Sequence, residues 1–271
     1  MRRMRGRILV PALFALIMVA PGSAQTVSGD VPEANPGRPT VSTPATLTPA
    51  GYLQFENGAL YAEESPEFSA RLGFNQVTKL TVLPRLELLL ESEPFVRSLI
   101  EKQKEVHEGE VFAGFQAVLL PGAHSRPTIA VSYFRRVHAG PAPEVDIGTS
   151  EQNALLLVSG DIWGFHFDAN GIIAEQTEGL LRRGQFGQTL SVSHALKKLT
   201  ISSEIWHFSQ PLIRSDATGT LWALAYPLRL NLVIDAGFDH GLTGTSTQWE
   251  GFAGFTYLLP HRLWGPHNRS R

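Results

Sequence analysis

The alternation of apolar and polar residues between Leu228 and Phe238 is the most regular pattern in the chain. Every second residue, from Leu228 through Leu232 to Phe238, is apolar, and most residues between them are polar or small. Because successive side chains of a strand point to opposite faces, this stretch predicts a strand with one apolar and one polar face. Its eleven residues suit a tilted strand that crosses a bilayer, whereas soluble strands usually run about five to six. If the pattern recurs, the chain is a membrane β-barrel.

The same alternation recurs along the chain after residue 50 and predicts about twelve strands. An even number of strands is typical of single-chain bacterial barrels, so the fold class expected is an all-β, antiparallel transmembrane β-barrel. The predicted strands are Tyr52–Glu63, Phe68–Leu80, Arg85–Phe95, Glu110–Leu120, Thr128–Val137, Gln152–Ser159, Ile162–Ile172, Gln185–Ala195, Leu199–Phe208, Thr220–Tyr226, Leu228–Phe238 and Thr247–Leu258.

The connections between the predicted strands differ in length according to their order. Short turns follow every even-numbered strand, and longer connections follow most of the odd-numbered ones, although the first and last of these are short. Short periplasmic turns and longer outer loops are typical of outer-membrane barrels, and a soluble sandwich has no reason to alternate in this way. The predicted short turns are 82–84, 121–124, 160–161, 197–198 and Pro227.

The first 24 residues have the composition of an export signal. Four Arg precede the apolar run Ile8–Ala20, and Gly22-Ser23-Ala24 supplies the small residues of a cleavage site before Gln25. Thirteen apolar residues are fewer than the roughly twenty that a spanning helix needs. We therefore expect Met1–Ala24 to be a signal peptide and the mature protein to reside in the outer membrane.

Composition narrows the function classes. Removal of four Arg and no acid takes the formal charge from −2 to −6, so no positive excess remains for nucleic acid. The chain has no Cys, which excludes a disulfide framework, and no later apolar run is long enough for a helical membrane protein. The nine His are scattered without metal-ligand spacing, and no cofactor motif is present, so no metal or cofactor is expected.

Residues 25–50 are rich in Pro, Thr and Ser, and five Pro between 32 and 49 oppose both helix and sheet. Two interpretations stay open for this arm. It is either a flexible terminus of the mature chain or an extended segment that folds back into the barrel lumen as a partial plug. The chain then divides into a signal peptide (1–24), the arm (25–50), the barrel (51–259) and a C-terminal tail (260–271).

Charged residues within the predicted strands share the polar parity, and an Arg or Lys on the lipid face costs about 2–4 kcal/mol near the midplane. They are therefore expected to line the lumen, where seven acids outnumber three bases. Two interpretations stay open: a salt-bridged network that fills a narrow barrel, or a polar path for a solute. The predicted lumen residues are Glu56, Arg71, Arg85, Glu87, Glu91, Glu204, Arg229, Asp235, Asp239 and Glu250.

Several short motifs resemble the outer-membrane transporters named for the meta-pathway of phenol degradation (MetA-type). These motifs are Arg38-Pro39, Pro49-Ala50-Gly51, Gln54-x-Glu56-x-Gly58, Arg85-Leu86-Glu87-Leu88 and Asp235-Ala236-Gly237 with Gly241-Leu242. The resemblance implies a barrel that passes small hydrophobic or aromatic compounds, and it assigns no catalytic residues. The chain departs from the family at the turn Leu83-Pro84 and in the tail Pro260–Arg271, which follows the last predicted strand.

An enzymatic alternative comes from His207 and Ser209, which share one face of a predicted strand. Barrel lipid A deacylases use such a pair facing lipid, but the third member, an acid, is not assignable here, because Glu204 has inward parity. The function expected is therefore a channel for small molecules, with no catalytic residues. A lipid-modifying barrel enzyme and a closed structural barrel are the alternatives. The expected partners are outer-membrane lipid, the barrel-assembly machinery and an unidentified small solute, with no nucleic acid.

Overall fold

A computed structural model of the chain describes residues 32–123, 126–143, 145, 150–212 and 215–264. The predicted signal peptide Met1–Ala24 and the first mature residues lie outside this range. The described residues form a closed, antiparallel β-barrel, as predicted. None of them belongs to a helix long and apolar enough to cross a membrane.

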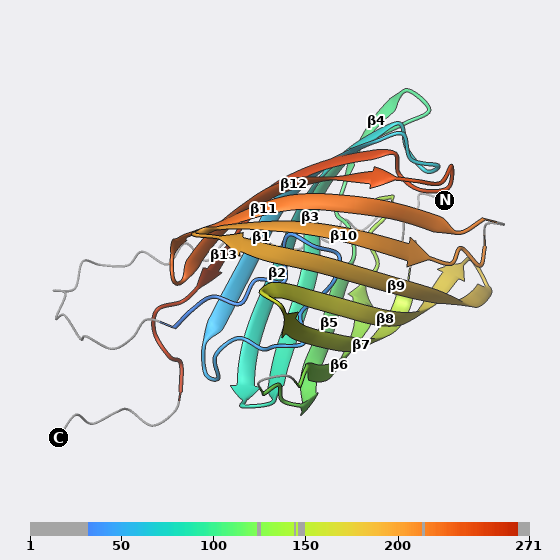
Figure 1. Cartoon of the computed structure of the whole chain (residues 1–271). Coiled ribbons are helices and arrows are strands. Elements are labelled where there is room, and N and C mark those ends of the chain that lie inside the picture. The colour runs from blue at the N-terminus through green and yellow to red at the C-terminus, as the bar shows by residue number, and fades with distance from the viewer. Residues whose placement is uncertain (1–31, 124–125, 144, 146–149, 213–214, 265–271) are drawn as a thin grey trace, which may run out of the picture. The chain divides into compact units, whose positions relative to one another are not determined.

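One continuous antiparallel sheet contains all thirteen strands of the described part of the chain (Figure 1). These strands are β1 (Leu53–Glu63), β2 (Ala70–Leu83), β3 (Leu86–Ile100), β4 (Gln103–His107), β5 (Val111–Leu120), β6 (Thr128–His138), β7 (Ser150–Ile162), β8 (Phe165–Glu178), β9 (Leu181–Leu196), β10 (Leu199–Phe208), β11 (Ala217–Arg229), β12 (Leu232–Gly241) and β13 (Trp249–Leu258).

The sheet closes on itself because β1 pairs with both β2 and β13, over ten or more residues on each side. β4 pairs with β3 alone, from Val96 opposite His107 to Ile100 opposite Gln103. It therefore extends the β3 hairpin beyond the barrel and adds no strand to the wall. The wall then has twelve strands, which confirms the predicted number.

The strand predicted from Leu228 to Phe238 is wrong, because it runs through a turn. β11 continues to Arg229, the turn lies at Leu230 and Asn231, and β12 begins at Leu232. Pro227, predicted as the turn, instead lies within β11 opposite Val233, next to a register shift between Pro227 and Arg229, and such irregular pairings are where strands tolerate proline. The apolar alternation continues through Leu228 and Leu230, so it gave no sign of the boundary.

The other short turns are displaced less. β7 and β8 meet at Trp163 and Gly164, whose φ angles of 52° and 82° make a tight left-handed turn, instead of at 160–161. β2 and β3 meet at 84–85. The turn predicted at 197–198 is confirmed, and Lys197 there has a φ of 59°.

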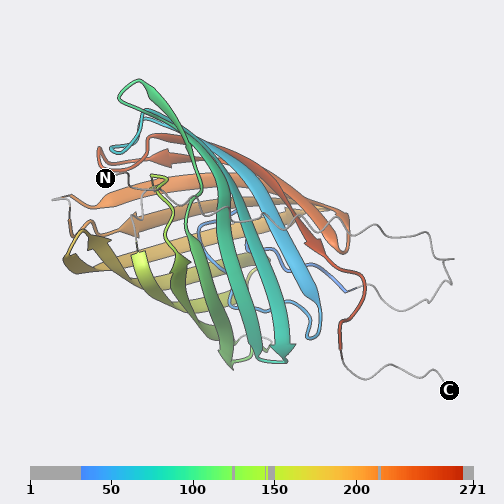
Figure 2. The same cartoon turned by 180° about the vertical axis from the view of Figure 1, so that it is seen from behind.

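The two faces of the wall differ in polarity as the alternation predicts. Leu88 and Leu90 of β3 are each 45% exposed on the outside, whereas Glu87 is buried. Likewise Trp222 and Leu224 of β11 are exposed. Figures 1 and 2 show the closed sheet from both sides. An apolar outer face on such a sheet needs lipid rather than water against it.

An Arg placed on this outer face should destabilise the barrel according to its depth. Leu224 lies near the middle of β11 and Leu228 near its end. Leu224→Arg should lower the free energy of unfolding from lipid vesicles by about 2–4 kcal/mol, and Leu228→Arg by about 1 kcal/mol or less. Urea titration followed by tryptophan fluorescence measures both values. Equal losses for the two variants would contradict the assignment of a lipid-facing belt.

Candidate functional site in the barrel lumen

Residues 32–50, called the arm from here on, lie inside the barrel. The arm is hydrogen-bonded to side chains of nine of the twelve wall strands, which together surround it. A short segment can reach so many strands of a closed sheet only from within, and Figure 2 shows it there. These partners are Gln54, Glu56, Thr81, Glu87, Gln116, Ser159, Asn170, Thr189, Glu204 and Asp235. Of the two interpretations of this segment, the structure therefore supports the one in which it folds back into the lumen as a partial plug.

Glu204 of β10 holds the middle of the arm. It accepts the backbone N–H groups of Val41 and Ser42, both at 2.7 Å, and the hydroxyl of Ser42 at 2.5 Å. The side chain of Glu204 is almost wholly buried. A buried carboxylate is costly without such donors, so these bonds stabilise the carboxylate and the arm together.

Arg38 connects the arm to β12. Its Nη2 and Nε donate to the two carboxylate oxygens of Asp235, at 3.0 and 3.3 Å, and its guanidinium lies 5.9 Å from the centre of the Phe252 ring. Two paired glycines make room for it: a Cβ on Gly58 would lie 2.5 Å from Arg38 Cζ, and one on Gly254 would lie 2.7 Å from Nε. The Arg38 side chain therefore fits at this position because Gly58 and Gly254 have no side chains.

Two further carboxylates hold the ends of the arm. Glu56 of β1 accepts the N–H of Gly37 at 3.0 Å and forms an ion pair with Lys79 of β2, with 2.6 Å between Nζ and Oε1. Glu87 of β3 accepts the N–H of Thr48 at 3.0 Å, together with the Thr48 hydroxyl. The arm is thus held at both ends and in the middle by acids of the wall.

Eight of the predicted lumen residues lie on the inner face. Glu56, Arg71, Glu87, Glu204, Asp235 and Asp239 are buried there, and Glu91 and Glu250 line cavities. Arg85 and Arg229 do not: Arg85 lies in the β2–β3 turn and Arg229 at the exposed end of β11. Both corrections have one cause, because the predicted strands began one and four residues before the observed ones.

The sequence interpretation missed several lumen charges, among them Lys79, Glu93, Glu110 and Arg38. Lys79 lies on the same face of β2 as Arg71 and could have been found by parity. Glu93, which binds Arg71, lies within the predicted strand at the polar parity of Glu87 and Glu91, so parity could have found it too. Glu110, which binds Arg136, begins a predicted strand but precedes the observed β5 by one residue. Arg38, discussed above, follows no alternation, so no periodic signal marks it.

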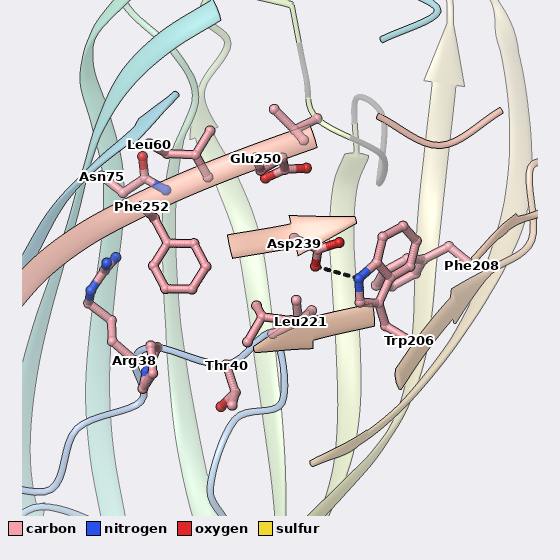
Figure 3. Close-up of a pocket in the computed structure, with 13 residues that line it drawn as sticks. Arg38, Thr40, Leu60, Asn75, Trp206, Phe208, Leu221, Asp239, Glu250 and Phe252 are labelled. Atoms are coloured by element: carbon pink, nitrogen blue, oxygen red, sulfur yellow. Dashed lines mark hydrogen bonds between the residues drawn. The ribbon is translucent and has the colours of Figure 1, made fainter. Parts of the chain in front are cut away.

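A cavity of about 270 Å³ lies beside the arm, on the side of the longer loops (Figure 3). The rings of Trp206, Phe208 and Phe252 form its apolar part, and Asp239 and Glu250 form its acidic part. The Trp206 indole N–H donates to Asp239 Oδ2 at 2.6 Å. Asp239 and Glu250 are directly opposite each other on β12 and β13. The arrangement offers a solute both ring faces and negative charge.

A second cavity of about 420 Å³ adjoins the first, and the two share Thr40, Val41 and Asn75 as lining residues. Its charged lining includes Glu110, whose carboxylate bonds Arg136 at 2.5 Å. Burial raises the pKa of the Glu110 carboxyl above its ordinary value, and the hydrogen bond from Arg136 opposes this rise. The outer part of the lumen is thus a connected, largely acidic space.

A third cavity, of about 300 Å³, lies on the short-turn side of the arm. Hydroxyl groups of Ser191, Ser193, Thr200 and Ser202 line it together with His166 and Asp168, and its lining contains no Phe, Tyr or Trp. Because the arm residues Arg38, Pro39 and Thr40 line both this cavity and the first one, the arm forms the boundary between them. The lumen therefore has an aromatic, acidic outer part and a hydroxyl-lined inner part.

His207 and Ser209, the residues of the enzymatic alternative, do not meet as a pair. The two ring nitrogens of His207 bond Gln188 and Asp216, both at 3.1 Å. Ser209 accepts the N–H of Phe186 at 2.8 Å. Asp216 is an acid that the sequence interpretation missed, and it bonds one imidazole nitrogen as the acid of a triad would. Gln188 occupies the other nitrogen, which has to be open to the serine if the imidazole is to act as its base. Among the described residues, no group of three or more His, Cys, Asp or Glu could hold a metal ion.

The close contact between Arg38 and the glycines of the wall gives a direct test of the arm's position. Gly58→Ala should push Arg38 off Asp235 and lower the free energy of unfolding by about 1–3 kcal/mol, because the three atoms nearest to the added Cβ all belong to Arg38 and a buried carboxylate loses its charged donor. Gly251→Ala is the matched control on the paired strand β13, since no atom lies within 4 Å of its added Cβ. Urea titration compares the two variants. A loss of stability in both variants, or in neither, would show that Arg38 does not lie against this glycine and bond Asp235.

Comparison with known proteins agrees with the fold. No family model and no curated protein sequence matches the chain. The COG4313 outer membrane channel from Pseudomonas putida F1 superposes with a TM-score of 0.59 at 10% identity, over 84% of this chain and 100% of that one. The translocator domain of the autotransporter NalP from Neisseria meningitidis gives 0.44 at 11% identity, over 76% and 86%. The P. putida toluene transporter TodX gives 0.40 at 10% identity, over 79% and 91%. At these identities, the likeness to the first of them shows that the chain shares the fold of an outer-membrane β-barrel.

Proposed function

We propose that this protein is an outer-membrane channel for small molecules, in which the arm forms the constriction of the pore. The observation that carries the proposal is the pair of cavities on either side of residues Arg38–Thr40, within a closed wall. A structural barrel without transport would have no need of solvent-sized spaces at both ends of its lumen. The likeness in fold to an outer-membrane channel supports the same function.

The lining of the outer cavity suits small solutes with an apolar or aromatic part. Three aromatic rings lie on the path between the longer loops and the arm, where ring faces can stack on a flat solute. The hydroxyl groups on the other side of the arm offer exchangeable hydrogen bonds that hold no solute tightly. The resemblance to MetA-type sequences points to the same class of solutes.

The charge of the lumen should make the channel select cations. On the inner face, acids outnumber the bases Arg38, Arg71 and Lys79, and Asp239 opposite Glu250 concentrates negative charge at the outer cavity. Two like charges in this arrangement destabilise a sheet, so an attraction for cations is a reason for their presence.

Reversal potentials across a salt gradient test this selectivity in planar bilayers. The wild type should prefer cations, with a preference that weakens as salt is added, because the charges are partly hydrated. Glu250→Gln should reduce the preference. Glu101→Gln, at the exposed tip of the β3–β4 hairpin, should leave it unchanged. An anion-selective pore, or one indifferent to Glu250, would overturn the assignment.

Removal of the arm tests the constriction itself. A chain that lacks residues 32–48 should conduct severalfold more than the wild type, because the arm occupies the middle of the lumen. Glu204→Gln keeps the arm but weakens its central anchor, so this variant should show more frequent opening steps at an unchanged maximum conductance. Heat-modifiable mobility on gels shows that each barrel is folded. An unchanged conductance in the folded, armless barrel would place the constriction elsewhere.

A further inference from the structure

The short-turn end of the barrel carries exposed positive charge at almost every connection. Its exposed bases are Arg85, Arg126, Lys197, Lys198, Arg229 and Arg262. Among the described residues, none of these side chains forms an ion pair, and only two exposed acids, Glu33 and Asp161, lie at this end. The longer loops differ, because exposed acids and bases are mixed there. The chain thus concentrates free cations at one rim.

Large apolar side chains accompany these cations. Leu83, Ile162, Leu196 and Leu230 are each more than half exposed at the ends of the strands, and Trp163 is 95% exposed at the tip of its turn. Water solvates such turns poorly, whereas the boundary between lipid headgroups and acyl chains accommodates both an indole and a cation. Short turns are periplasmic in outer-membrane barrels, so this rim faces the inner leaflet.

One position on this rim has the form of a binding site. A groove of about 380 Å³ lies at the β11–β12 turn and is lined by Arg229, Leu230, Asn231, Leu232, Tyr257 and Pro260. Leu232 and Tyr257 are paired neighbours on β12 and β13, with the parity of the exposed Ile234 and Phe255, so the floor of the groove continues the lipid-facing belt. Arg229, at its edge, is exposed.

We propose that this groove binds the headgroup of an anionic phospholipid of the inner leaflet. The Arg229 guanidinium pairs with the phosphate, since its planar donors match phosphate oxygens. The apolar floor accommodates the upper acyl chains, and Tyr257 lies at the level of the headgroup. The other basic turns hold the same class of lipid around the rim through charge alone. This proposal does not depend on whether the lumen conducts.

Native mass spectrometry of the folded protein released from nanodiscs tests the site. The discs contain equal amounts of phosphatidylglycerol and phosphatidylcholine, and the retained lipids are counted. The wild type should retain phosphatidylglycerol preferentially. Arg229→Gln should lower the ratio of the two lipids about fivefold, because one basic residue near an anionic surface contributes roughly that factor. Arg229→Lys should keep part of the preference.

Arg97→Gln is the matched control, because Arg97 is an exposed arginine of β3 on the side of the longer loops. It should leave the ratio unchanged. Equal retention of the two lipids by the wild type, an unchanged ratio in Arg229→Gln, or an equal loss in Arg97→Gln would overturn the proposal. Displacement of phosphatidylglycerol from the wild type by added lipopolysaccharide would also overturn it, since that lipid belongs to the other leaflet.

Discussion

A carboxylate inside a closed barrel needs donors, and this requirement organises the lumen. Glu56, Glu87, Glu204 and Asp235 project from different strands toward the axis, where each is buried. The arm supplies backbone N–H groups, hydroxyls and one guanidinium to these acids. Because Pro residues keep the arm extended, its N–H groups stay available for the wall. The acids and the arm are therefore a single unit, because each satisfies hydrogen-bonding groups of the other.

This dependence links permeation to stability. Each hydrogen bond that holds the arm in place also keeps the lumen narrow. The residues that stabilise the arm inside the barrel are therefore those that a solute has to pass. The aromatic rings around Trp206 also contact the arm, because Val41 packs against Trp206 and Phe208 and Arg38 lies over Phe252. The same rings line the outer cavity, so a solute can meet them while the arm stays bound.

The sequence predicts the barrel well because lipid imposes a strict period of two on every strand. It predicts the turns less well, because Leu228, Leu230 and Trp163 are apolar even where the chain reverses, so the alternation does not stop there. That error moved Arg85 and Arg229 into the lumen. The inward acids follow parity, whereas Arg38 lies in a segment without regular structure and meets an acid 197 positions away. No local pattern contains such a contact.

The arm lies near the start of the sequence, yet its partners are spread to the far end of it. Val41 bonds Glu204 across 163 positions, and Arg38 reaches Asp235 across 197. Until those strands have been made and brought together, the arm has only part of its acceptors and remains open to proteases. A segment near the start of the chain is therefore among the last to acquire all its hydrogen-bond partners. Protection of the arm from proteolysis thus requires strands from both halves of the chain to be in place.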